Sequence, residues 1–273
     1  MAKKKKETKE IAEIPEISFD DIETVEDVER AVLAGYTFED VDFAGSDLSE
    51  AKLAGAVLVN ANLAGVNMMD ADLTGANLSG AILAGAVLNG AKLSGALVVE
   101  ADLSGADLSA AELDGSDFSG SDLSGADLSG SNLSGALFME CSLAGADLAG
   151  SVLHHTDFTG SDLSGASLHE ADALDAIFQD ADLSGVEIGG AIFKGVLLEG
   201  ADLSGAGARK TDFSEALAQA VDFSGADIEK AAFKKADLRG SDFSGVAAKG
   251  ANFKKARLKE ALTEDLVGAK NVK

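Results

Sequence analysis

A five-residue repeat constrains this chain more than any other feature, because it runs without a break from residue 31 to residue 260. Its unit is small, polar, Leu or Phe, Ser, Gly, as in the segment 101–105. The third position is Leu, Phe, Ile, Met or Val in 42 of 46 units, and the first is small in 45, with Tyr36 the exception. Helices repeat every 3.6 residues and strands every 2, so neither carries this pattern. The chain must therefore turn once in each unit.

A second period, of four units, sets how many units form one coil. Phenylalanines recur at this spacing at Phe118, Phe138, Phe158 and Phe178, and again at Phe193, Phe213, Phe233 and Phe253. Like residues stack into ladders at this spacing if each coil has four sides. The fifth position holds 28 of the 31 glycines, and glycine allows the positive φ of tight turns. With about 4.8 Å between adjacent coils, the array predicts a rod about 55 Å long.

The repeat resembles that of the pentapeptide-repeat proteins, whose consensus is Ala-(Asp/Asn)-Leu-x-x. The matching triplets include residues 61–63, 101–103, 126–128 and 201–203. The resemblance covers most of the chain, since the repeat keeps its register throughout. It implies an all-β solenoid, a right-handed quadrilateral β-helix with first- and third-position side chains inside and the others outside. We therefore expect one β-helix domain over residues 31–260, with about 11–12 coils and short α-helical caps.

The two ends depart from the repeat. Residues 1–17 are charged and predict a flexible tail, and residues 18–35 predict a helical cap. In this cap Thr24 and Asp27 form a capping-box pattern, and Gly35 is placed to end the helix. Residues 256–273 predict a second helical cap, because Leu258, Leu262 and Leu266 are four residues apart. One interpretation is that both helices only cover the exposed β-edges of the stack, which would otherwise invite end-to-end aggregation. The other, which the resemblance implies because related family members pair in this way, is a homodimer through the C-terminal cap.

Composition excludes several classes of function. The net charge is −25, so nucleic acids and anionic membranes repel the chain, and we expect no direct nucleic-acid binding. One cysteine excludes a disulfide framework. No apolar run approaches the roughly 18 residues of a spanning helix, and no apolar stretch follows the basic run Lys3–Lys6. These features predict a cytoplasmic protein without membrane insertion.

Motifs that carry chemistry are lacking. The sequence has no nucleophile elbow, Walker loop or dinucleotide fingerprint. Cys141 takes an inward first position, which predicts a buried small side chain. His154, His155 and His169 do not share a side of the coil in a way that favours a metal site. We expect no enzyme activity, no cofactor and no metal.

Charge is distributed unevenly. Residues 31–200 carry 26 acidic and 3 basic residues, whereas residues 231–273 carry 5 acidic and 10 basic ones. One side of the rod holds an acidic stripe at its second positions: Asp42, Asp102, Asp122, Asp162, Asp182, Asp202, Asp222 and Asp242. One interpretation is that Asp is the family consensus here, because short acidic side chains bond turn amides.

The other interpretation of the acidic stripe is imitation of a DNA backbone. Some family members resemble B-form DNA and bind DNA gyrase, inhibiting it or protecting it from drugs. This chain departs from them because Leu dominates its core and its register admits no projecting loop. Both interpretations stay open at this stage.

Another side carries outward aliphatic residues, which we call the apolar ridge: Val57, Leu97, Leu137, Ile177, Leu197 and Leu217. Up to Ile177 they alternate with polar residues every second coil, a spacing of about 9.6 Å. Scattered exposed aliphatics are ordinary, whereas a continuous row indicates a contact surface. Besides an ordinary surface, the candidates are docking of a partner, of another copy, or of the folded-back N-terminal segment.

These observations predict a non-enzymatic structural or protein-binding rod whose protein partner the sequence does not identify. The alternative prediction is a DNA-mimicking protein that binds gyrase or another topoisomerase.

Overall fold

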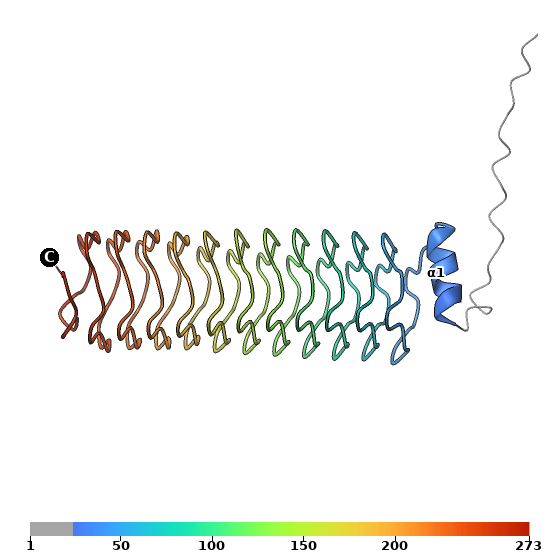
Figure 1. Ribbon diagram of the computed structural model, residues 1–273, viewed down its shortest axis with the longest axis horizontal. Coiled ribbons are helices and arrows are strands. Elements are labelled where there is room, and N and C mark those ends of the chain that lie inside the picture. Colours follow the sequence, from blue (N-terminus) through green and yellow to red (C-terminus); the bar gives the residue numbers. More distant parts are fainter. Residues whose placement is uncertain (1–23, 273) are drawn as a thin grey trace, which may run out of the picture.

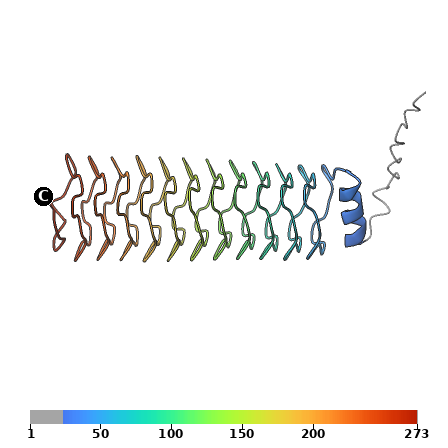
Figure 2. The same ribbon diagram turned by 45° about the horizontal axis from the view of Figure 1, so that its top comes forward.

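The computed structural model describes residues 24–272, which form one long rod of stacked coils (Figure 1). Helix α1 lies at one end of the rod and the C-terminus at the other. The coils remain stacked when the molecule is turned about its long axis (Figure 2). The tail expected over residues 1–17 lies outside the described residues, as do residues 18–23 of the expected N-terminal cap.

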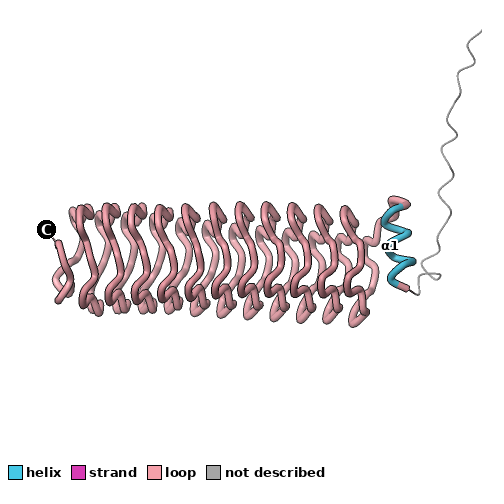
Figure 3. Tube along the Cα trace, viewed as in Figure 1, coloured by secondary structure: helices cyan, strands magenta, loops and turns pink. Residues whose placement is uncertain are grey.

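Neighbouring coils are joined by parallel β-bridges between residues that lie four units apart. These begin at Thr37–Val57 and continue on all four sides to Asp242–Leu262. Each side contributes a single bridging residue rather than a longer strand, so Figure 3 draws the coils as loop. The predicted coil of four units and the right-handed quadrilateral β-helix are confirmed.

Every backbone N–H of a typical unit has an acceptor, as residues 102–106 illustrate. The N–H of Asp102 bonds the previous coil at Ala81 O (3.0 Å), and those of Leu103 and Gly105 bond the next coil. The N–H of Ala106 closes the turn onto Leu103 O at 3.0 Å. The remaining donor, Ser104 N, reaches the Asp102 carboxylate at 3.0 Å. The second-position Asp therefore completes the hydrogen bonding of its own turn.

The fifth residue of each unit has a left-handed backbone. Gly105 is typical, with φ of 62°. Some corners hold a residue with a side chain instead, for example Glu100 at φ 55° and Lys235 at φ 64°. Such residues carry a conformational cost that glycine avoids, which explains why glycine dominates this position.

The core consists of the inward first and third positions. Leu103 and Leu123 lie on adjacent coils and are both fully buried. The predicted phenylalanine ladders are present, with ring centroids 4.8 Å apart for Phe118–Phe138 and 4.7 Å for Phe233–Phe253. Because each side chain inside touches its equivalents above and below, the tube is filled along its length.

Helix α1 (Val25–Leu33) closes the N-terminal end of the rod. It begins with the expected capping box between Thr24 and Asp27. It ends in a Schellman motif, in which Gly35 has φ of 81° and Tyr36 N bonds Ala31 O at 3.0 Å. Among residues 24–272, no helix has the length and apolar character needed to cross a bilayer.

The helix also caps an open hydrogen-bonding group of the first coils. The N–H of Lys52 donates to the carboxylate of Glu29 at 2.8 Å. One coil further, the equivalent donor Asp72 N bonds a backbone carbonyl of the preceding coil, Ala51 O, at 2.9 Å. The Glu29 side chain thus supplies the hydrogen-bond acceptor that a preceding coil provides elsewhere in the rod.

The predicted helix over residues 256–273 is wrong, because the described part of this segment contains no helix. Its backbone instead continues the coil. Phe243 N donates to Leu262 O (3.0 Å), and Leu262 N donates to Ser241 O (2.9 Å). A helix here would leave those groups of the preceding coil without partners, which costs more than the amphipathic pattern gains.

The last coil is shorter than the others and ends the tube. Its final bridge joins Asn252 to Lys270, a pair closer along the chain than those of the regular coils. Leu266 is buried, and Leu258 and Val272 pack against the core. The solenoid bonding therefore extends past the predicted boundary at residue 260, and the C-terminal cap is irregular rather than helical.

Candidate functional site

The eight residues of the acidic stripe lie on one side of the rod, as predicted. Bridges link this side from Asp42 through Asp122 to Asp242. The row is interrupted by Asn62, Ile82 and Ser142. The stripe residues are exposed or half-buried.

Each carboxylate of the acidic stripe accepts a hydrogen bond from the backbone N–H two residues later. Asp122 Oδ1 lies 2.9 Å from Ser124 N, and Asp242 Oδ1 lies 2.8 Å from Ser244 N. The bonds to the side chain and N–H of Ser244 lower the pKa of Asp242 below its ordinary value of 3.8. Aspartates on the other sides make the same turn bond, for example Asp127 with Ser129 N at 2.9 Å. The stripe residues therefore have a structural role in their turns.

The apolar ridge residues are also brought together on one side. Bridges connect Val57 to Leu217 through the intervening coils. Leu97 and Leu217 are 45% and 44% exposed, and the other four are half-buried. Polar Asp117 and Asp157 alternate with the ridge residues, as the sequence predicted. The ridge is thus a real row, set in a surface that is otherwise mostly polar.

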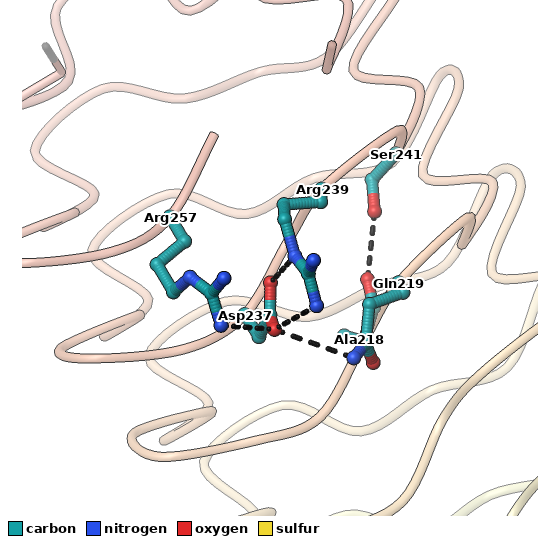
Figure 4. A network of polar contacts seen from close by, with 6 residues as sticks. All are labelled: Ala218, Gln219, Asp237, Arg239, Ser241 and Arg257. Carbon is teal, nitrogen blue, oxygen red and sulfur yellow. Dashed lines mark hydrogen bonds and ion pairs between the residues drawn. The ribbon is translucent and has the colours of Figure 1, made fainter. Parts of the chain in front are cut away.

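An ion-pair cluster, which the sequence did not suggest, ends the apolar ridge (Figure 4). The side of the ridge continues through Asp237, which is only 5% exposed. Arg239 holds its carboxylate with two bonds of 2.8 and 2.7 Å, and Arg257 of the next coil adds a third at 2.8 Å. Gln219 Nε2 lies 3.3 Å away. Hydrogen bonding to Arg239 is the largest cause of the lowered pKa of Asp237.

A hollow of about 540 Å³ lies on a third side, lined in part by Gly189, Gly207, Glu187 and Arg209. A side chain at position 207 would overlap the carboxylate of Glu187. Arg209 is held by Asp227 and Glu229, at 2.8 and 2.5 Å. The sequence does carry a signal for this hollow, since Gly189 and Gly207 lie outside the fifth position.

The residues considered for chemistry are dispersed. Cys141 is buried, as expected, and burial raises its pKa to about 12. His154 Nε2 lies 2.9 Å from Asp172 Oδ2, and His169 Nε2 lies 3.7 Å from Glu170 Oε1. Among residues 24–272, no group of three or more His, Cys, Asp or Glu side chains is placed to hold a metal ion.

Comparison with known families and structures agrees with this geometry. The family model described as "Pentapeptide repeats" matches in eight copies between residues 37 and 262, which together cover that range except residues 173–175. HetL, a pentapeptide repeat protein involved in heterocyst differentiation regulation from the cyanobacterium Nostoc sp. strain PCC 7120, is similar in structure. It is 27% identical, with a TM-score of 0.55, over 89% of this chain and 95% of HetL. No curated protein sequence matches the chain.

Two further structures are similar at a lower level. One is a pentapeptide repeat protein from the Arabidopsis thaliana thylakoid lumen, 32% identical over 40% of this chain and 68% of that one, with a TM-score of 0.32. The other is QnrB1, a plasmid-mediated fluoroquinolone resistance protein, 20% identical over 86% of this chain and 92% of QnrB1, with a TM-score of 0.42. Both TM-scores are below 0.5, so neither similarity carries functional weight.

Proposed function

This chain belongs to the pentapeptide-repeat family, and on that premise we propose that it is a non-enzymatic, cytoplasmic protein-binding rod that engages its partner through the apolar ridge. The observation that carries the proposal is the row of six outward aliphatic residues on one side, from Val57 to Leu217. Leu97 and Leu217 each leave nearly half of their surface in water. Covering such a row on binding is favourable by about 25 cal/mol per Å² of apolar surface.

A filled tube favours binding over catalysis. Its inward side chains pack against one another and leave its outer faces as the working surfaces. Straight sides built from stacked coils suit an extended contact with another protein. The chemistry of these sides therefore determines which partner the rod can bind.

The test is a triple variant, Leu97→Asp with Leu137→Asp and Ile177→Asp. A matched control places three Asp residues at outward aliphatic positions on other sides: Ile82→Asp, Val152→Asp and Ile192→Asp. Ile82 and Ile192 are 45% and 42% exposed, so the control removes a similar apolar surface and adds the same charge. Affinity capture from the native lysate and the mass in solution are measured for both.

We expect the ridge variant to lose the captured proteins that the wild type and the control variant retain. A ridge variant that keeps both its captured proteins and its mass in solution would contradict the proposal. A wild-type mass of one chain would also argue against the homodimer through the C-terminal cap, which already lacks its predicted helix.

The second candidate is a DNA-mimicking binder of gyrase or another topoisomerase, which the charge density favours. Residues 31–200 have a net charge of −23, from 26 acidic and 3 basic residues. Spread over about eight and a half coils of about 4.8 Å, this is about one charge per 1.8 Å of rod. B-form DNA carries about one charge per 1.7 Å.

A gyrase supercoiling assay, with and without a quinolone, separates the two candidates. A DNA mimic should change the supercoiling activity at low salt, and raising the salt should abolish its effect. A rod that binds through the apolar ridge should leave supercoiling unchanged, and its partner contact should be little affected by salt.

A further inference from the structure

One edge of the apolar-ridge side carries carboxylates and glycines in alternation. The fifth positions along this corner run Glu100, Gly120, Glu140, Gly160 and Asp180. The corner residues Glu100 and Glu140 have positive φ, 55° and 56°, where glycine would be the unstrained choice. The chain therefore keeps carboxylates on every second coil at a conformational cost.

Each glycine lacks a side chain, and the carboxylate side chain at the equivalent position of the preceding coil lies next to the space left there. A Cβ built on Gly120 would lie 3.4 Å from Cγ of Glu100, and one on Gly160 would lie 3.7 Å from Cγ of Glu140. The pattern repeats every second coil, or about 9.6 Å. We call the space at each such glycine a corner notch.

The corner notch at Gly120 is a hollow of about 300 Å³. It is lined by the apolar side chains of Val99 and Met139 from the adjacent coils and by Ser119. The hydroxyl of Ser119 is fixed by Asp117 Oδ1 at 2.6 Å. The lining of the notch thus combines a fixed hydroxyl, two apolar side chains and the residues Glu100 and Glu140.

The carboxylates of this corner have no cation of their own. Glu100 and Glu140 are exposed, and within residues 24–272 neither makes an ion pair or a side-chain hydrogen bond. Another corner of the same molecule shows what such a carboxylate binds. Glu215 also occupies a fifth position, and Lys235, one coil further, places its Nζ 2.7 Å from Glu215 Oε1. At the corner notches a glycine stands where that lysine would be.

We propose that the corner notches bind a basic segment of a partner protein in the polyproline II conformation, in which Lys or Arg side chains three residues apart point the same way and each enter one notch. Three residues of such a segment make one turn and span about 9.3 Å, close to the notch spacing of about 9.6 Å. The aliphatic stem of each side chain packs between residues such as Val99 and Met139, and its charge meets Glu100 or Glu140. This deepens the proposed function and rests on it, because the notches border the apolar ridge.

The test uses two fluorescent peptides of equal composition added to the full chain. In one, three lysines are three residues apart in a Ser/Gly background; in the other, the three lysines are consecutive. Both peptides feel the same overall attraction to an acidic rod, so any difference reports on spacing. We expect the spaced peptide to bind about fivefold tighter in fluorescence anisotropy at low salt, as two or three exposed ion pairs would give.

Variants locate the effect. Glu100→Gln with Glu140→Gln and Asp180→Asn should abolish the preference for the spaced peptide. The control Asp107→Asn with Asp127→Asn and Asp147→Asn removes the same charge from another side and should preserve it. These are exposed or half-buried outward positions, and amide side chains can still accept the turn bonds of the aspartates.

Several results would overturn the proposal. Equal binding of both peptides, or equal loss of the preference in the two variants, would leave only unspecific charge attraction. Self-association that the notch variant abolishes would assign the notches to a second copy. A preference for the spaced peptide that appears only after Lys3–Lys6 are replaced by glutamine would indicate that the notches bind the chain's own first residues. If the spacing preference fails while the Leu97, Leu137 and Ile177 variant still loses its partners, the proposed function stands without this inference.

Discussion

The coils of residues 53–113 and those of residues 213–253 form the same tube from different side chains. In the first region the inward third positions are all Leu except Met68 and Val98. In the second, Phe213, Phe233 and Phe253 occupy one side and Phe223 and Phe243 another, with Ala, Ile or Leu between them. Rings on one side stack 4.7–5.0 Å apart, and rings on different sides meet edge to face at 5.7–6.1 Å. Because large rings on two sides accompany smaller residues on the other two, we expect the core volume to be conserved for each coil rather than for each position.

The two regions also differ in how their outer surface is held. In the described chain, no ion pair involves residues 31–150. In the C-terminal region Lys235, Arg239 and Arg257 each bond a carboxylate of the same or a neighbouring coil. The first region relies on glycine corners and turn-bonded aspartates, and the second adds cross-coil charge pairing.

The largest expected effect comes from removing a ring of the phenylalanine region. Phe233→Ala should lower the free energy of unfolding by about 3–5 kcal/mol, because it leaves a cavity. It also removes stacking on Phe213 and Phe253, at 4.9 and 4.7 Å. The matched variant Leu73→Ala in the leucine region should lose about 1 kcal/mol less, since it forfeits no ring contact. Chemical denaturation followed by circular dichroism measures both; equal losses would remove the energetic distinction between the regions.

A smaller effect tests whether volume is kept constant by coil. Ala218→Leu alone should destabilise the rod by about 1–3 kcal/mol, because the neighbouring Phe213 and Phe223 already fill that coil. Combining it with Phe213→Leu and Phe223→Leu recreates a leucine coil and should recover at least half of that loss. A triple variant less stable than Ala218→Leu would show that the phenylalanine region depends on its rings and not on its total volume.

The smallest effect concerns the ion-pair cluster at the end of the ridge. Asp237→Asn should cost about 1–2 kcal/mol, since the two arginines that hold the carboxylate are themselves partly exposed. The pKa of Asp237 is lowered in the folded protein, chiefly by Arg239, so its charge stabilises the fold above its ordinary pKa of 3.8. The difference from wild type should therefore be constant near neutral pH and shrink as the pH falls below about 4.

Asp242→Asn is the control for this pH dependence. Asp242 also has a lowered pKa, but its partner is Ser244 rather than an arginine. An asparagine can accept the same turn bond, so the control should cost less than Asp237→Asn at neutral pH. Equal costs would mean that the arginines contribute no more than a turn amide does.

The sequence predicts most of the fold because its signals are local and repeated. The positions of Leu103 and Leu123, the phenylalanine ladders and the capping box at Thr24 each follow from spacing alone. The second-position Asp was open to two interpretations, and the bond from Ser124 N to Asp122 supports the structural one without excluding a role in binding.

What the sequence did not predict depends on contacts between residues far apart in the repeat. Leu258, Leu262 and Leu266 have helical spacing, but the preceding coil supplies hydrogen bonds that a helix would forgo. The burial of Asp237 depends on Arg257, which belongs to the next coil. The alternation of carboxylates and glycines at the notch corner can be read from the sequence, but the hollow at Gly120 between Val99 and Met139 exists only once the coils are stacked.

The hydrogen bonds that join the coils run along the length of the rod, which decides how the molecule responds to tension. When the two ends of the chain are pulled apart, the few hydrogen bonds that hold a terminal coil break first, and the interior coils open only after it. Each coil that peels away frees four units, or about 70 Å of extended chain. Under a steady force the protein should therefore unfold coil by coil from an end and lengthen in even steps, rather than unfold in one cooperative event.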